Sequence, residues 1–117
     1  MTIDNDNDLE GLKKIGGIVA RTLQAMGKAL EPGMTTRELD DIGRKLLEAE
    51  GARSAPELEY NFPGATCISV FPDIAHGIPG DRVVQPGDLV NIDVSAELDG
   101  YFADSGASVP VPPVTPA

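Results

Sequence analysis

The chain has 117 residues, enough for one small domain, and 41% of them are hydrophobic, so a core is possible. The formal net charge of −10 opposes binding to nucleic acid or to an anionic membrane surface. No apolar run approaches the ~20 residues that span a bilayer, the acidic N-terminus lacks a signal-peptide pattern, and the one cysteine, Cys67, cannot form an internal disulfide. We therefore expect a cytoplasmic protein.

The first predicted element is an amphipathic helix over residues 8–31, after a polar segment, 1–7, that we expect to be flexible. Asn7 with Glu10 resembles a capping box at its start, and Pro32-Gly33 ends it. Its apolar stripe follows steps of three and four residues: Leu9, Leu12, Ile15, Val19, Leu23, Met26 and Leu30.

A second helix is predicted over residues 36–50. Thr35 and Glu38 form a better capping box directly before it, and Gly51 ends it. Its stripe consists of Leu39, Ile42, Leu46 and Ala49. Both stripes must cover something, and the following strands are the candidates.

The second half of the chain predicts strands. Residues 51–63 are irregular, and 65–71 is prone to form a strand. Residues 88–98 alternate between apolar and polar side chains, and 101–109 returns as a partner strand after an Asp99-Gly100 hairpin turn. The apolar side of the first hairpin strand carries Val90, Ile92, Val94 and Ala96, and the polar side carries Asn91, Asp93 and Ser95.

These elements predict one mixed α/β domain of the α+β type over residues 8–109, with two helices packed on an antiparallel sheet. The last segment, 110–117, is rich in proline and is expected to be an extended linker. Because a linker normally leads to another domain, this ending suggests that the chain was cut before one.

The hairpin register places two acidic residues near each other. A turn centred on Asp99-Gly100 puts Ser95 opposite Asp104, so Asp93 and Asp104 become diagonal neighbours with Cβ atoms roughly 5–8 Å apart. Two carboxylates so close repel one another, and a divalent cation between them relieves the repulsion. The alternative is a solvent-facing hairpin edge with scattered acidic residues.

Two further residues could carry chemistry. His76, the only histidine, lies in a loop rich in glycine and proline, where it could be a hydrogen-bond donor or proton shuttle, or simply a surface or packing imidazole. Cys67 is expected to be buried as a small hydrophobic residue. A nucleophilic role for this thiol lacks an identifiable basic partner.

Three motifs together resemble the bacterial-type methionine aminopeptidase family. They are YNFPGATCIS, AHGIP and PGDLVNIDVSAELDGYFAD, with eleven residues from Asp93 to Asp104. The resemblance covers nearly the whole chain, including the two helices and the PGMTTREL turn between them. One departure is that Ser105-Gly106 follows Asp104 where threonine is common in the family.

The resemblance implies half of a pita-bread fold and the removal of N-terminal methionine from peptides and nascent proteins. It implies that Asp93 and Asp104 are ligands of two divalent metal ions, which could be cobalt, manganese, iron or zinc. His76 matches the family histidine that hydrogen-bonds the scissile peptide, and Phe62 and Cys67 match positions that line the pocket for the methionine side chain.

The resemblance also implies that a second half brings one more histidine and two glutamates to the metals. We therefore expect residues 1–117 to be inactive alone and to self-associate through apolar surface meant for that half. Two alternatives remain: a non-catalytic module that binds a metal or a partner, and a proline-type aminopeptidase of the same fold.

Overall fold

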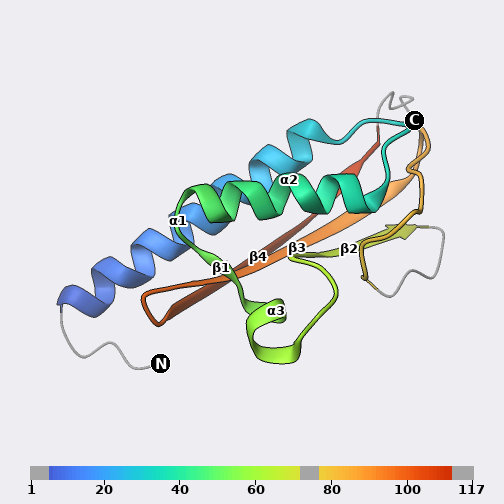
Figure 1. Ribbon diagram of the computed structural model, residues 1–117. Helices are drawn as coiled ribbons and strands as arrows, with labels where there is room; N and C mark the ends of the chain where they lie inside the picture. Colours follow the sequence, from blue (N-terminus) through green and yellow to red (C-terminus); the bar gives the residue numbers. More distant parts are fainter. Residues whose placement is uncertain (1–5, 72–76, 112–117) are drawn as a thin grey trace.

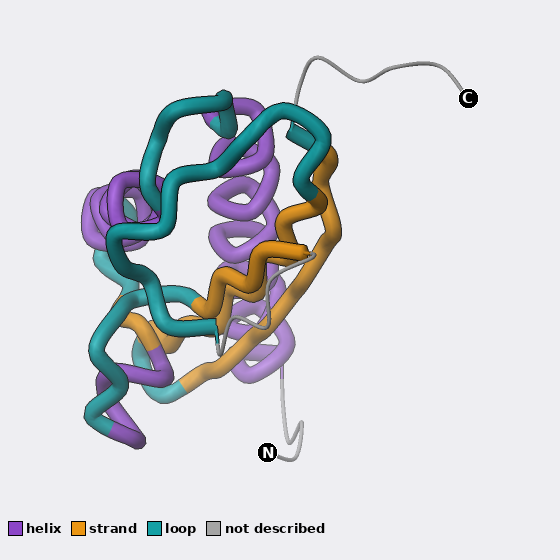
Figure 2. The backbone as a smooth tube through the Cα atoms, turned by 90° about the vertical axis from the view of Figure 1, so that its right-hand side faces the viewer, coloured by secondary structure: helices purple, strands orange, loops and turns teal. Residues whose placement is uncertain are grey.

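In the computed structural model, which describes residues 6–71 and 77–111, two long helices cover one face of a four-stranded antiparallel sheet (Figures 1 and 2). The first helix, α1, spans Asp6–Ala29 and buries only part of the predicted stripe: Ile15, Val19 and Met26. Leu9 of that stripe is exposed, and Ile18 and Thr22 are buried in addition. Asn7 lies inside α1, so the prediction that it caps this helix is wrong. Instead, Asp6 and Asp8 occupy the first turn, where negative charge is stabilised by the helix dipole.

The second helix, α2, spans Thr36–Ala49 and begins with the predicted capping box. The Thr35 side chain accepts a hydrogen bond from the Glu38 amide at 3.1 Å, and the Glu38 carboxylate accepts one from the Thr35 amide at 3.0 Å. Two backbone donors at the helix start are thereby satisfied, which fixes where α2 begins.

The buried side of α2 differs from the predicted stripe. It runs through Leu39, Gly43 and Leu47, whereas Leu46 is only partly buried and Ala49 is exposed. The reason lies at the crossing with α1, because a Cβ at Gly43 would lie only 2.7 Å from Met26 Sδ. The two helices therefore pack closely at this glycine. As a result, α2 is turned about its own axis so that Gly43, and not Leu46, faces α1.

The region 51–63 is more ordered than predicted. It contains a short strand, β1 (Arg53–Ser54), and a helix, α3 (Ala55–Tyr60). The Ser54 hydroxyl accepts a hydrogen bond from the Glu57 amide at 3.4 Å and donates one to the Ala65 carbonyl at 2.7 Å. Ser54 therefore caps α3 and also joins the two ends of the segment 54–65, which contains α3. Pro56 suits the first turn of a helix because its fixed φ is already helical.

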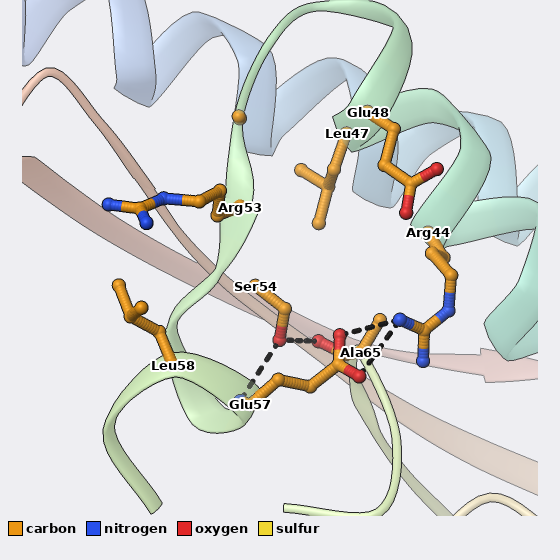
Figure 3. A pocket seen from close by; sticks show the side chains of 9 residues that line it. Arg44, Leu47, Glu48, Arg53, Ser54, Glu57, Leu58 and Ala65 are labelled. Carbon is orange, nitrogen blue, oxygen red and sulfur yellow. Dashed lines mark hydrogen bonds and ion pairs between the residues drawn. The ribbon is translucent and has the colours of Figure 1, made fainter. Parts of the chain in front are cut away.

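A salt bridge joins the segment 54–65 to α2. The Arg44 guanidinium donates to both carboxylate oxygens of Glu57, at 2.7 and 2.8 Å, and these residues border a pocket of about 310 Å3 (Figure 3). Leu47, Ala52, Leu58 and Ala65 form its apolar lining. The salt bridge links α3 to the C-terminal half of α2 across this pocket, while α3 itself lies beside β1 and β3 (Figure 1).

The sheet is built around the strand β3 (Leu89–Leu98). The strand β4 (Tyr101–Pro110) pairs with its whole length on one side, while β1 and β2 (Cys67–Phe71) pair with its two ends on the other. The predicted register is confirmed, with Leu98 paired to Tyr101 across the Asp99-Gly100 turn. Both turn residues have positive φ, of 55° and 87°, as a type I′ turn requires.

The core lies between the helices and the sheet. The buried side chains of β3 face α1 and α2. In the described ranges 6–71 and 77–111, no helix is long and apolar enough to cross a membrane. The N-terminal half of α1 is fixed to the hairpin tip by Tyr101, whose hydroxyl donates to Asp8 at 2.6 Å while its ring packs on Gly11. The largest buried core side chains are Ile15, Ile18, Met26, Leu39, Leu47, Ile68 and Ile92.

One buried carboxylate gives the fold a pH dependence that can be measured. The side chain of Glu97 is 8% exposed, and it accepts hydrogen bonds from Arg53 at 3.0 Å and from the Gly100 amide at 2.8 Å. The bond from Arg53, followed by that from Gly100, lowers the pKa of Glu97 below its ordinary value. The ionised form is therefore favoured in the folded state.

We expect Glu97→Gln to flatten the acid side of the stability curve. A lowered folded pKa gives stability that is fully present above the unfolded value of about 4.3 and is lost as pH falls through the folded value. Urea unfolding of the parent and the variant between pH 3 and pH 6 measures this, with exposed Glu59→Gln as the control. Equal pH slopes in the parent and Glu97→Gln would show that the contact contributes nothing.

Candidate metal centre

The sheet face opposite the helices is polar in its middle and carries exposed Phe71, Leu89 and Phe102 toward its ends. Along β3, Asn91, Asp93 and Ser95 point to this side, because successive strand residues alternate between faces. Their cross-strand partners, which share the face, come from β2 and β4: Ser69, Cys67, Ser108, Gly106 and Asp104. Both Asp93 and Asp104 are exposed, so within the described residues this face is open to solvent.

The structure brings the two predicted metal ligands together. Ser95 pairs with Asp104 and Asp93 pairs with Gly106, so the two aspartates are diagonal neighbours, as the sequence predicted. Both border one shallow depression of about 570 Å3, together with Ser95, Ser105 and Gly106. Two carboxylates at the rim of one depression could supply charged oxygen ligands to a shared divalent cation.

Gly106 provides the space that the Asp93 carboxylate occupies. A Cβ at position 106 would overlap Oδ1 of Asp93 and lie 3.2 Å from its Cγ. Any larger residue there would force the Asp93 carboxylate to swing away.

Cys67 lies directly opposite Asp93, at the start of β2. Burial raises the pKa of its thiol, and the negative charges of Asp93 and then Asp40 raise it further. The thiol is therefore protonated at neutral pH and is a weak nucleophile. The sequence predicted a fully buried Cys67, but the residue is only partly buried because it shares the open sheet face with Asp93.

The remaining predicted site residues are placed less completely. His76 lies outside the described residues, but its neighbour Gly77 is buried and accepts a hydrogen bond from the Ile68 amide at 2.9 Å. A Cβ at Gly77 would lie 3.5 Å from Cys67 Cβ, so the chain next to His76 passes beside Cys67. Phe62 follows α3 and is partly buried, and its amide donates to the Pro56 carbonyl at 3.2 Å.

The acidic pair accounts for only part of a metal site. Over residues 6–71 and 77–111, no group of three or more His, Cys, Asp or Glu side chains could hold a metal ion. A hard divalent cation takes about six ligands, so two carboxylates fit its chemistry but leave most of its coordination to other groups. The pocket of Figure 3 contains neither aspartate and is a separate feature.

Sequence reasoning missed two residues that shape this face. Gly106 has a recognisable signal, since a glycine inside a strand often marks a close approach of other atoms. Asp40 is the second, a carboxylate on the buried side of α2 that accepts hydrogen bonds from the residues just before Cys67. Its signal is a charged residue next to Leu39 and one turn after Thr36, on a helix face that must be buried.

We expect Gly106→Ala to weaken the binding of Mn²⁺ to the 117-residue chain by about tenfold or more, because residues that orient metal ligands have effects of this size. The unfolding midpoint should change little, since the short Asp93 side chain can rotate. Electron paramagnetic resonance of free Mn²⁺ measures the affinity. Ser108→Ala, on the same strand and face, is the control, and equal affinity in Gly106→Ala and the parent would contradict the role given to Gly106.

Comparison with known proteins identifies the family and the fold of the chain. The profile of Metallopeptidase family M24 matches residues 10–117. Over 109 residues the chain is 55% identical to Methionine aminopeptidase 2 of Bacillus subtilis (strain 168), covering 92% of this chain and 44% of that protein. The chain thus spans about half the length of the relatives it matches.

Solved structures give the same result for the fold. The crystal structure of methionine aminopeptidase from Rickettsia prowazekii superposes with a TM-score of 0.87 at 33% identity, over 98% of this chain and 46% of that one. An X-Pro aminopeptidase from Thermotoga maritima MSB8 gives 0.71 at 25% identity, over 92% and 29%. The expected half of a pita-bread fold is confirmed, and the chain belongs to metallopeptidase family M24.

Proposed function

We propose that this chain supplies one half of a metal-dependent aminopeptidase that removes N-terminal methionine from peptides and nascent proteins. The observation that carries the proposal is the diagonal pair Asp93 and Asp104 on the open sheet face, with Gly106 making room for one carboxylate. The 55% identity to Methionine aminopeptidase 2 supports methionine as the residue removed. Nascent proteins as substrate imply a cytoplasmic location.

In this proposal Asp93 and Asp104 hold two divalent cations, which could be cobalt, manganese, iron or zinc. When bound, such ions supply an activated water and polarise the scissile carbonyl. The aspartates contribute negative oxygen ligands from two adjacent strands of a rigid hairpin. Their mutual repulsion is relieved by the shared positive charge, which gives the pair a reason to bind cations.

The other proposed site residues contact the substrate. Cys67, protonated and partly buried, would form with Phe62 an apolar wall for the flexible thioether of methionine. His76 would donate a hydrogen bond to the scissile peptide. The anchoring of its neighbour Gly77 beside Cys67 supports a place for this histidine near the same wall.

The ligand inventory separates this half from a complete enzyme. One histidine and the Asp93–Asp104 pair cannot hold two cations in the geometry that hydrolysis needs. Residues 1–117 alone are therefore proposed to bind at most one cation weakly and to self-associate through exposed apolar surface. A second copy would double the aspartates without adding the missing ligand types.

A chimera tests the proposal. Residues 1–109 replace the matching segment of Bacillus subtilis Methionine aminopeptidase 2, and methionine release from Met-Ala-Ser is measured with added Co²⁺ or Mn²⁺. We expect activity from the chimera and none from the 117-residue chain alone. A folded but inactive chimera would refute the proposal, and cleavage of an X-Pro peptide instead would favour the proline-type alternative.

In the active chimera, Asp93→Asn or Asp104→Asn should abolish hydrolysis, because each variant removes a charged ligand. Asp99→Asn is a matched control, since it removes the same charge from the exposed hairpin tip. Near-parent rates in either site variant would show that the pair does not hold the metals.

His76→Ala should lower turnover while the metal content of the purified chimera stays unchanged, because its proposed role is hydrogen bonding to substrate. Elemental analysis of the variant measures this. Loss of the ions from His76→Ala would show that the histidine is a ligand instead.

A further inference from the structure

Two buried polar residues of α2, Thr36 and Asp40, lie one helical turn apart and face the sheet side of the molecule. Each makes hydrogen bonds to a different segment that is distant in sequence. Asp40 contacts residues 65–66, and Thr36 contacts Gly80. Polar side chains on a helix face that must be buried are costly unless their bonds are satisfied, so their partners are informative.

Both carboxylate oxygens of Asp40 accept hydrogen bonds. Its side chain is only 4% exposed, and one carboxylate oxygen accepts from both the amide and the hydroxyl of Thr66, at 2.7 and 2.5 Å. The other oxygen accepts from the Ala65 amide at 3.1 Å, and Arg44 lies 3.9 Å away. These bonds take the place of ladder bonds at the start of β2, which explains why this strand begins at Cys67 rather than at the predicted residue 65.

Thr36 fixes the second segment in a similar way. Its hydroxyl accepts from the Gly80 amide at 2.8 Å and donates to the Gly80 carbonyl at 3.2 Å. The Arg37 amide also donates to that carbonyl, at 2.9 Å. The start of α2 therefore fixes the chain three residues after Gly77.

The two segments also touch one another. A Cβ at Gly64 would lie 2.7 Å from Pro79 Cδ and 3.4 Å from Asp40 Oδ2, so only a glycine allows this approach. Both segments continue to the open sheet face, one through Thr66 into Cys67 and the other through Gly77, which passes beside Cys67. The side of the candidate site away from the β3–β4 hairpin thus depends on α2.

We propose that Asp40, supported by Thr36, is a positioning residue that sets where Cys67 lies relative to Asp93. In this role Asp40 contacts neither the metal nor the substrate. It acts through the backbone of residues 65–67. The positioning of Cys67 by Asp40 does not depend on the proposed function. Only its expected effect on methionine binding rests on that function. The hairpin that carries Asp93 and Asp104 is formed by β3 and β4 and needs no contact with Asp40.

Amide hydrogen exchange on the 117-residue chain tests the positioning without any need for activity. Asp40→Asn keeps the shape but replaces one acceptor oxygen by a donor group. We expect exchange at Ala65, Thr66 and Cys67 to rise about tenfold, as for loss of one charge-assisted hydrogen bond, while amides in the centre of β3 keep the parent rate. Asp41→Asn removes the same charge from the exposed side of α2 and is the matched control.

A uniform rise across β2 and β3 would show that Asp40 only stabilises the fold, and no rise at residues 65–67 would show that it positions nothing. Either result overturns the proposal. If Asp40→Asn does not fold, Thr66→Val serves as the milder variant, because it removes the hydroxyl donor and keeps the amide. It should raise exchange at the same residues, by less, and a uniform or absent rise counts against the proposal in the same way.

In the chimera, Asp40→Asn should raise KM for Met-Ala-Ser while kcat stays near the parent value, because the wall moves and the acidic pair does not. An equal fall in kcat and kcat/KM would contradict this division. If the parent chimera is inactive, the proposed function fails, and the exchange pattern still decides whether Asp40 positions Cys67.

Discussion

The structure depends on the two-sided character of β3. This strand is hydrogen-bonded along both edges, so its side chains can only point to the helices or to the open face. Val90, Ile92, Val94 and Ala96 are each 0% exposed beneath α1 and α2. A slip of one residue would bring these four side chains into solvent and push Asp93 into the core. The burial of one face therefore fixes the position of the acidic pair on the other.

The parts of this arrangement that are local in sequence could be predicted. The Asp99-Gly100 turn and the period-two pattern before it determine the β3–β4 register, and with it the diagonal relation of Asp93 and Asp104. The capping box of Thr35 and Glu38 is likewise a pattern of four residues. Each of these features is determined by neighbours that the sequence itself places in contact.

What could not be predicted depends on residues far apart in the chain. Asp40 bonds to residues 25 and 26 positions away, and Thr36 to one 44 positions away. Gly43 rotates α2 because Met26 of another helix lies against it, which a single-helix pattern cannot show. Gly106 was noted only as a departure from a family pattern, since its contact with Asp93 crosses between strands. The strand β1 was missed because it pairs with residues 96 and 97, more than forty positions away. The helix α3 carries a local signal, Ser54 three residues before Glu57 with a proline between them, and it could have been predicted.

In the proposed function Asp93 and Asp104 bind the same ion on the open sheet face. Paramagnetic broadening by Mn²⁺ in amide NMR spectra of the 117-residue chain tests it most directly. We expect the amides around residues 93 and 104 to broaden together at the lowest Mn²⁺ concentrations, and Asp93→Asn to remove the broadening on both strands. Broadening centred instead on other acidic residues, such as those at the start of α1, or on one hairpin strand alone, would contradict it.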